Sequence, residues 1–148
     1  MKVIPLFILC LLVALSPVLC ATISEETLLR DCKGELAMGN YSQAVVSFGR
    51  FIRNYPKSKL KAEALYWKGV SYLSDSKRDS AKASWDQISR TDAFWYSRAH
   101  LSLGVVYAGE KSWKASADEL KKAAAHADSS LLSSVWYQNY INAQKNGN

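Results

Sequence analysis

The sequence predicts an all-α protein, a solenoid of about three helical hairpins followed by one capping helix. Two observations lead to this prediction. No stretch shows the strict alternation of apolar and polar residues that is typical of a half-buried strand. Pairs of small residues twelve positions apart also recur, at spacings of 37 and 35 residues: Cys32 with Ala44, Gly69 with Ala81, and Gly104 with Ser116. Periods of this length are typical of stacked helix pairs, whose crossings need small side chains.

The first twenty residues have the pattern of a secretory signal peptide. Lys2 gives a positive start, residues 3–15 are apolar apart from one proline, and Cys20 offers a small side chain at the cleavage point. The apolar run is shorter than the roughly 20 residues that a membrane-spanning helix needs. We therefore expect residues 1–20 to be removed, so that an exported protein begins at Ala21 and is periplasmic or secreted.

Lipid attachment at Cys20 is disfavoured. Lipoprotein peptidases take a small residue directly before the modified cysteine, and Leu19 stands there. The rest of the chain, residues 21–144, is expected to form one domain, because no linker or change of composition divides it. Cys32 is the one cysteine outside the leader, so the domain has to be stabilised by packing without an internal disulfide.

The first hairpin is predicted from its ends. Residues 22–25 read as a capping box, in which the Thr hydroxyl and the Glu carboxylate each satisfy free backbone N–H groups. The helix is expected to continue to Met38 and to stop at Gly39, which accepts a left-handed backbone. Asn40 is the predicted N-cap of the second helix, and Pro56 ends that helix because proline cannot continue it.

The next two hairpins repeat this scheme. Their first helices are centred on Gly69 and Gly104, and their second helices carry Trp85 and Leu120 at the expected core positions. Residues 74–77 form the turn of the second hairpin. Leucine in place of either glycine would overpack the crossing, at a cost of roughly 1–3 kcal/mol or more.

A last helix is predicted over about 130–144, with Asp128 as its N-cap. We expect this helix to cap the stack with a polar outer face, as terminal repeats of solenoids do. Residues 145–148 are predicted to be a frayed tail.

Several segments resemble the tetratricopeptide repeat (TPR). Residues 39–44 (Gly-Asn-Tyr-Ser-Gln-Ala), with Phe48 and the Tyr-Pro pair at 55–56, are similar to the second half of a repeat. Residues 64–73 are similar to the first half of the next, and 103–107 to a third. The resemblance covers residues 24 to about 124 and implies a right-handed α-solenoid that serves as a non-catalytic scaffold for protein–protein interaction.

The order Tyr-Pro-x-Ser and then Glu-Ala-x-Tyr-Trp-x-Gly is most similar to bacterial cell-envelope members of the family. These are the Tol-Pal-associated periplasmic coordinators and the outer-membrane lipoproteins that help to assemble β-barrels. The resemblance therefore implies a partner protein or peptide in the cell envelope.

The resemblance also implies a binding groove lined by the first helix of each hairpin. Basic groups at one end and apolar groups in the middle would suit a peptide with an acidic end and an aliphatic anchor. The alternative is that the apolar members are ordinary core residues. The predicted groove positions are Leu29, Arg30, Lys33, Tyr66, Val70, Leu73, Arg98, Leu101 and Val105.

A second functional hypothesis is a structural or assembly subunit that docks through the ends or the convex face of the solenoid. Its apolar surface would lie in the last helix, around Trp136, Tyr137 and Tyr140. Under both hypotheses the protein is expected to be a monomer or a weak oligomer.

Catalysis, metal binding and nucleic-acid binding are not expected. Cys32 takes the small position at a helix crossing, and neither His100 nor His126 has an evident orienting acid, so a nucleophile–base pair is disfavoured. Two histidines and one cysteine at these spacings do not form a metal-ligand set, and no cofactor is implied. The aromatic residues recur at repeat positions, which indicates a core rather than a base-stacking surface. A weak attraction of residues 57–61 to anionic membrane surfaces is compatible with their three lysines.

Overall fold

The computed structural model describes residues 24–146, and the regular secondary structure in this part of the chain is all α-helix, as predicted. The predicted signal peptide, residues 1–20, lies outside the described residues. None of the helices in residues 24–146 is long and apolar enough to cross a membrane. In chain order the helices are α2 (Glu25–Ala37), α3 (Tyr41–Asn54), α4 (Lys61–Ser74), α5 (Arg78–Trp85), α6 (Ala93–Gly109), α7 (Trp113–Ala124) and α8 (Ser129–Asn146).

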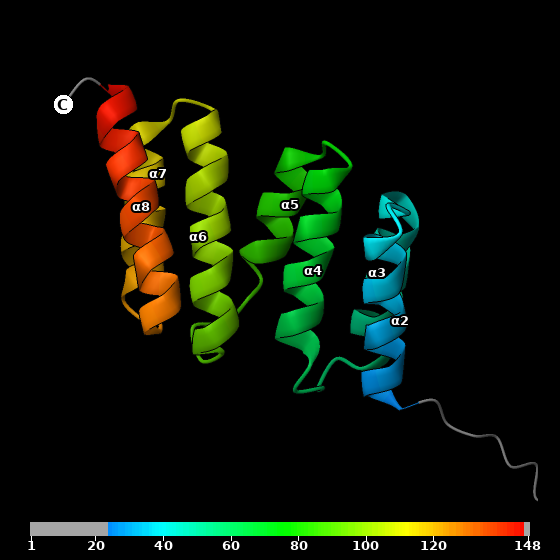
Figure 1. Cartoon of the computed structure of the whole chain (residues 1–148). Coiled ribbons are helices and arrows are strands. Elements are labelled where there is room, and N and C mark those ends of the chain that lie inside the picture. Colours follow the sequence, from blue (N-terminus) through cyan, green and yellow to red (C-terminus); the bar gives the residue numbers. More distant parts are fainter. Residues whose placement is uncertain (1–23, 147–148) are drawn as a thin grey trace, which may run out of the picture.

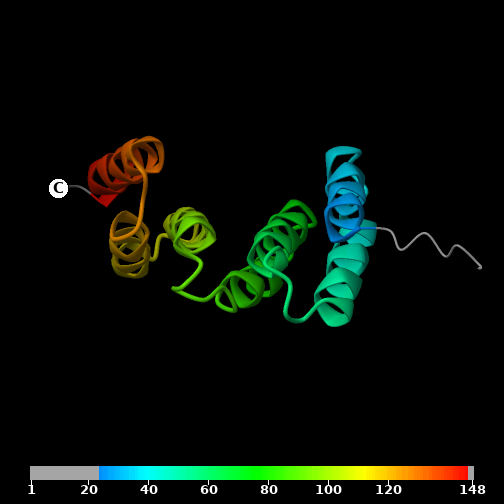
Figure 2. The ribbon, with the colours of Figure 1, turned by 90° about the horizontal axis from the view of Figure 1, so that it is seen from below.

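The helices stand side by side in one row, with α2 and α8 at opposite ends (Figure 1). Helices α2 and α3, α4 and α5, and α6 and α7 form the three predicted hairpins, and α8 packs on the last of them. The first helices of successive hairpins also contact one another, α2 with α4, α4 with α6, and α6 with α8. Seen from below, the row is bent rather than straight (Figure 2). This architecture confirms the solenoid prediction.

The ends of the first hairpin differ in detail from the prediction. Ser24 caps α2, because its hydroxyl accepts a hydrogen bond from the Thr27 N–H at 3.2 Å. Gly39 has the predicted left-handed backbone, with φ of +80°. Asn40 stands at the N-cap of α3, but its side chain makes no capping bond. Its backbone angles, φ −79° and ψ 58°, differ from the extended conformation that aims a capping side chain at the first amides.

The turns of the other two hairpins have the same left-handed backbone, but at residues other than glycine. Ser76 (φ 60°) and Lys111 (φ 59°) hold a left-handed backbone at the turns after α4 and α6, where Gly39 stands after α2. A left-handed conformation costs about 1–2 kcal/mol for a residue with a Cβ atom. The repeat geometry is therefore kept although two of its three turns have a residue other than glycine at this position.

Two of the three predicted crossings are as close as expected, but the closest partner differs from the prediction. A Cβ atom on Gly69 would lie 2.3 Å from Nε1 of Trp85, and one on Gly104 would lie 2.8 Å from the Leu120 side chain. In both cases the bulky residue comes sixteen positions after the glycine. Phe48 stands sixteen after Cys32 in the first hairpin, and it is fully buried like the other two.

Helix α8 begins as predicted, with the Asp128 carboxylate accepting from the Leu131 N–H at 2.8 Å. It runs on to Asn146, so two residues of the predicted tail are helical, and residues 147–148 lie outside the described part. The prediction of a polar outer face is wrong. Three large aromatic side chains of α8 are exposed, Trp136 by 69%, Tyr137 by 67% and Tyr140 by 60%.

Candidate functional site

An aromatic stripe runs across the first helices of the second and third hairpins. Tyr66 and Trp67 come from α4, and Phe94 and Trp95 come from the start of α6. The Trp95 ring lies 5.2 Å from that of Tyr66, 6.5 Å from that of Trp67 and 4.9 Å from that of Phe94, measured between centroids. Such separations are favourable for aromatic pairs. Phe94 is half exposed, so the stripe ends in an apolar side chain that is open to solvent.

Charged groups flank the stripe on both sides. Toward α2, Lys33 Nζ pairs with Glu63 Oε1 at 2.9 Å, and the same oxygen accepts from the Trp67 indole at 3.3 Å. Toward the end of the row, the Arg98 guanidinium lies 3.5 Å from the centroid of the Phe94 ring. A guanidinium over an aromatic face is attracted by the ring quadrupole, and it can still donate hydrogen bonds from its edge.

The Asp128 carboxylate, which lies near Arg98, is too far away to bind the guanidinium tightly, so the guanidinium is partly available to a ligand. Asp128 Oδ2 lies 3.7 Å from the Arg98 nitrogen, which is beyond hydrogen-bond distance, and about half of the aspartate side chain is exposed. The guanidinium can therefore bind an acidic group of a ligand without first giving up a tight internal pair.

The structure brings some of the predicted groove residues together and separates others. Tyr66 lies in the stripe, and Lys33 and Arg98 flank it. Leu29 is buried in the core between α2, α3 and α4, so for this residue the alternative of an ordinary core position is correct. Val70 and Leu73 are partly buried and pack against the central core cluster, and Arg30 is exposed on α2.

The last two predicted groove residues line an open cavity between α6 and α8. Leu101 and Val105 form its α6 side, and Tyr137 and Gln138 form part of its α8 side. The cavity has a volume of about 410 Å³. The aromatic stripe, Arg98 and this cavity follow one another along the face formed by the first helices, and the cavity lies at the α8 end of the solenoid.

Sequence reasoning missed three members of this face, Trp67, Phe94 and Trp95. For Phe94 and Trp95 the signal was the aromatic run Phe94-Trp95-Tyr96, which lies at the start of α6. Trp95 stands 29 positions after Tyr66 and 28 after Trp67, about seven fewer than the repeat. Seven residues are two helical turns. The residues that touch between α4 and α6 are therefore shifted by two turns along the helix axis from the positions that the repeat spacing would pair.

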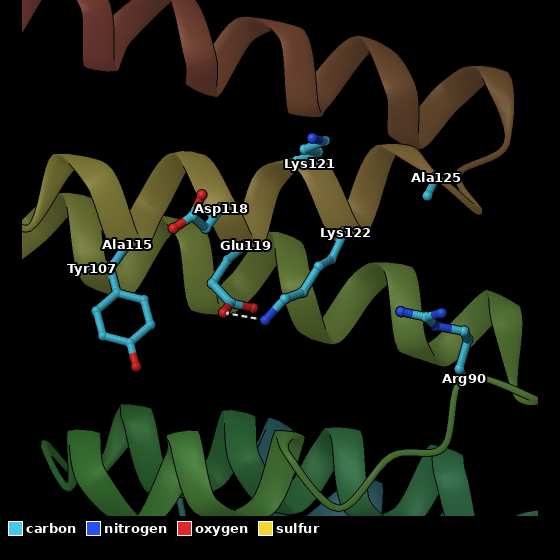
Figure 3. Close-up of a pocket in the computed structure, with 8 residues that line it drawn as sticks. All are labelled: Arg90, Tyr107, Ala115, Asp118, Glu119, Lys121, Lys122 and Ala125. Atoms are coloured by element: carbon cyan, nitrogen blue, oxygen red, sulfur yellow. Dashed lines mark hydrogen bonds and ion pairs between the residues drawn. The ribbon is translucent and has the colours of Figure 1, made fainter.

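A second hollow, of about 560 Å³, opens beside α7 (Figure 3). It exists because α5 is short and does not contact α7. The Tyr107 ring points into it from α6, and Arg90 reaches it from the connection between α5 and α6 (Figure 3). Glu119 and Lys122 of α7 face it as an ion pair of 2.7 Å. That hydrogen-bonded pair raises the pKa of Lys122.

Both carboxylate oxygens of Glu119, which faces the second hollow, are engaged. One binds Lys122, and the other lies 2.5 Å from Nδ1 of His100. His100 therefore does have an acidic partner, contrary to the sequence interpretation. This partner is nineteen residues away on the facing helix, and the pair ties α6 to α7 in a nearly buried position.

Cys32 is not placed for nucleophilic chemistry. Its side chain is buried, and burial raises the pKa of the thiol to about 11, so the reactive thiolate is scarce at neutral pH. Helix α2, which carries Cys32, does not contact α6, which carries His100. Within residues 24–146, no group of three or more His, Cys, Asp or Glu side chains is placed to hold a metal ion.

Comparison with known proteins finds one similarity. The family model described as tetratricopeptide repeat matches residues 35–58, from the end of α2 to just past α3. This match confirms the repeat character expected for that segment. TPR segments typically mediate protein–protein contacts and are typically not catalytic. No match was found among curated proteins, and none among solved structures.

Proposed function

We propose that the protein is a non-catalytic adaptor that binds a segment of another protein along the first helices of its hairpins. The aromatic stripe carries this proposal. It combines a half-exposed phenylalanine, a partly available guanidinium and an adjoining apolar cavity in one continuous face. Aromatic and arginine side chains are the types that most often dominate protein–protein binding energy.

The arrangement suggests the chemistry of the bound segment. An aromatic or aliphatic side chain would pack on Phe94 and Trp95, and a second apolar side chain would enter the cavity beside Leu101 and Val105. A carboxylate between them would bind Arg98. The segment would therefore carry one acidic residue between two apolar anchors, which refines the acidic end and aliphatic anchor expected from the sequence.

Export to the cell envelope is also part of the proposal. It is supported by the positive start, the apolar run and the small residue at position 20 in the sequence. The order of residues around Tyr55 and Trp67 supports an envelope partner, through its resemblance to bacterial envelope proteins. Mass spectrometry of the purified protein tests the export step. A mature N-terminus at Ala21 is expected, and an intact Met1 would contradict it.

Capture of the partner tests the binding face. The tagged protein should recover a partner from the cells that produce it, and Tyr66→Ala with Leu101→Ala should lose that partner while the helical content stays unchanged. Phe94→Ser is the sharper variant, because this side chain is half exposed. Val46→Ser on α3 is its control, since Val46 is 58% exposed against 51% for Phe94. Equal capture by Phe94→Ser and Val46→Ser would refute binding at the stripe.

An assembly subunit that docks through its last helix is the second candidate function. The exposed aromatic side chains of α8 favour it. Replacing Trp136 and Tyr140 by serine discriminates between the two functions. A partner held by α8 is lost in this variant, whereas a partner held by the stripe is retained.

A further inference from the structure

The segment from the end of α3 to the middle of α4 carries an unbalanced positive charge. Residues 50–68 hold six Arg and Lys side chains but a single carboxylate, Glu63, which already pairs with Lys33 at 2.9 Å. Within the part of the chain that the structure describes, none of the six cations lies within 4 Å of a carboxylate. The six are Arg50, Arg53, Lys57, Lys59, Lys61 and Lys68. Most Lys and Arg side chains of any protein are exposed, so their number alone does not define a site, but the geometry of two of them does.

Two of these cations converge on one point at the contact between α3 and α4. Arg53 Nη1 lies 3.5 Å, and Lys68 Nζ 3.9 Å, from the position that a Cβ atom of Gly49 would take. Both nitrogens therefore lie within 4 Å of the same point and are at most 8 Å apart. Because residue 49 is glycine, no side chain of its own occupies that point.

The positive charge of this pair is not compensated within the fold. Burial of the ammonium group and the nearby charge of Arg53 lower the pKa of Lys68. The Lys68 ammonium also lies 5.7 Å from the centroid of the Tyr72 ring, whose attraction for cations helps to hold it at the contact. Burial and a like charge both disfavour the charged form of lysine. An anion placed between the two cations would therefore be strongly favoured.

The next hairpin has an equivalent cation but supplies its own anion. Arg90 stands 37 residues after Arg53, which is a spacing of the repeat, and it lines the second hollow (Figure 3). The same hollow holds the Glu119 carboxylate, which pairs with Lys122 at 2.7 Å. Glu119 stands 35 residues after Ser84, so the equivalent position one hairpin earlier has a hydroxyl. The earlier hairpin thus lacks the carboxylate that balances the cations of the second hollow.

We propose that Arg53 and Lys68 bind a phosphate group with two negative charges, either inorganic phosphate or the phosphomonoester end of a larger molecule. A charge-assisted N–H···O bond is about 2.7–2.9 Å long, so two such bonds to different oxygens of one phosphate can bridge the two nitrogens. A phosphomonoester carries a charge of about −1.5 to −2 at pH 7 and compensates both cations, whereas a carboxylate compensates one. The planar guanidinium also donates to two oxygens of the same phosphate.

The remaining lysines of the segment favour a phosphate that belongs to a larger anion. Lys61 stands seven residues, or two helical turns, before Lys68, so it lies on the same side of α4. Lys57 and Lys59 precede it in the connection between α3 and α4. These three lysines are the ones whose attraction to anionic membrane surfaces is expected from the sequence, and clustered charge of one sign raises the local concentration of anions. The stripe and this site share no residue, so the adaptor function and phosphate binding can fail separately.

Thermal melts of the full chain in millimolar phosphate, against chloride at the same ionic strength, test the site. Phosphate should raise the Tm of the wild type, and Lys68→Gln and Arg53→Gln should each weaken its binding by about tenfold or more, because each removes a charge-assisted hydrogen bond. Arg78→Gln and Lys114→Gln, which change exposed cations outside the segment, are the controls and should respond as the wild type does. Without phosphate, Lys68→Gln should be at least as stable as the wild type, and a loss of stability there would indicate a structural role for the lysine instead.

Vesicles distinguish the two sources of the phosphate group. If a lipid supplies it, phosphatidylcholine vesicles that contain phosphatidic acid, whose headgroup is a phosphomonoester, should sediment the wild type but not Lys68→Gln. A response to inorganic phosphate without sedimentation identifies a soluble phosphate. Two results would overturn the proposal. One is a Tm that phosphate raises no more than acetate does at the same ionic strength, with no sedimentation by the vesicles. The other is a response that Lys68→Gln and Arg53→Gln share with Arg78→Gln, which would show only general screening of a basic surface.

Discussion

Replacing Gly69 by alanine gives the sharpest test of how the hairpins are packed. The added Cβ atom would lie 2.3 Å from Nε1, 2.6 Å from Cε2 and 2.7 Å from Cδ1 of Trp85, distances that real Cβ atoms essentially never show. The indole cannot easily move aside. It is fully buried, and its N–H donates to the Tyr66 carbonyl at 3.0 Å.

The magnitude follows from opposing effects. Alanine gains about 1 kcal/mol over glycine in the interior of a helix. Overpacking costs about 1–3 kcal/mol, and loss of the indole hydrogen bond would cost about 1 kcal/mol more. The expected result is a net loss of roughly 1–3 kcal/mol in the free energy of unfolding, measured by urea denaturation followed by circular dichroism.

Gly34→Ala is the matched control, because no atom lies within 4 Å of the Cβ position at this glycine inside α2. It should raise the free energy of unfolding by up to about 1 kcal/mol. In a Trp85→Phe background, which removes the indole nitrogen but keeps a ring carbon at the Cδ1 position, Gly69→Ala should lose part of its cost. The packing argument is refuted if Gly69→Ala stabilises the wild-type chain as Gly34→Ala does.

Three further predictions concern other parts of the chain. Lys111→Gly should stabilise the protein by up to about 1 kcal/mol in urea denaturation, because glycine removes the cost of the left-handed backbone at φ 59° but loses more chain entropy on folding; a destabilised variant would show that the lysine side chain is needed at this turn. A thiol reagent at neutral pH should label Cys32 only after unfolding, because the thiol is buried and its pKa is about 11; mass spectrometry of the peptide that carries Cys32 measures this, and rapid labelling of the folded protein would contradict it. Hydrogen bonds from Lys77 and Ser42 lower the pKa of Asp75, so the stability that they add is present above its ordinary value of 3.8 and is lost as the pH falls through the lowered value; Asp75→Asn should therefore be less stable than the wild type near neutral pH and equally stable in strong acid, and a constant difference at all pH values would argue against this linkage.

The fold could be predicted from the sequence because helix ends and crossings are local features. Gly39 and Asp128 mark helix boundaries by their own chemistry, and the small residues recur with the repeat. The sequence also has a bulky residue sixteen positions after each of these glycines, Trp85 after Gly69 and Leu120 after Gly104, and these are the residues that contact the glycines. This contact was missed because spacing alone does not show which side chain of the second helix covers the crossing.

The face of the candidate site could be predicted only in part. Tyr66 and Arg98 lie at predicted groove positions of first helices and are partly buried, whereas Trp95 joins them through the axial offset between α4 and α6. The exposed aromatic residues of α8 follow from the lack of a helix packed beyond it within the described residues. A periodic pattern of apolar residues does not tell which side of a last helix is covered.

Site-specific crosslinking from Phe94 tests most directly whether the stripe is the binding face. A photoreactive phenylalanine analogue at position 94, in the cells that produce the protein, should form a covalent adduct with one partner protein. Arg98→Glu should reduce this adduct, because it reverses the charge beside the ring. The same analogue at position 46 should not form the adduct. An adduct that forms equally from both positions, or none from position 94, would contradict the adaptor function proposed for this face.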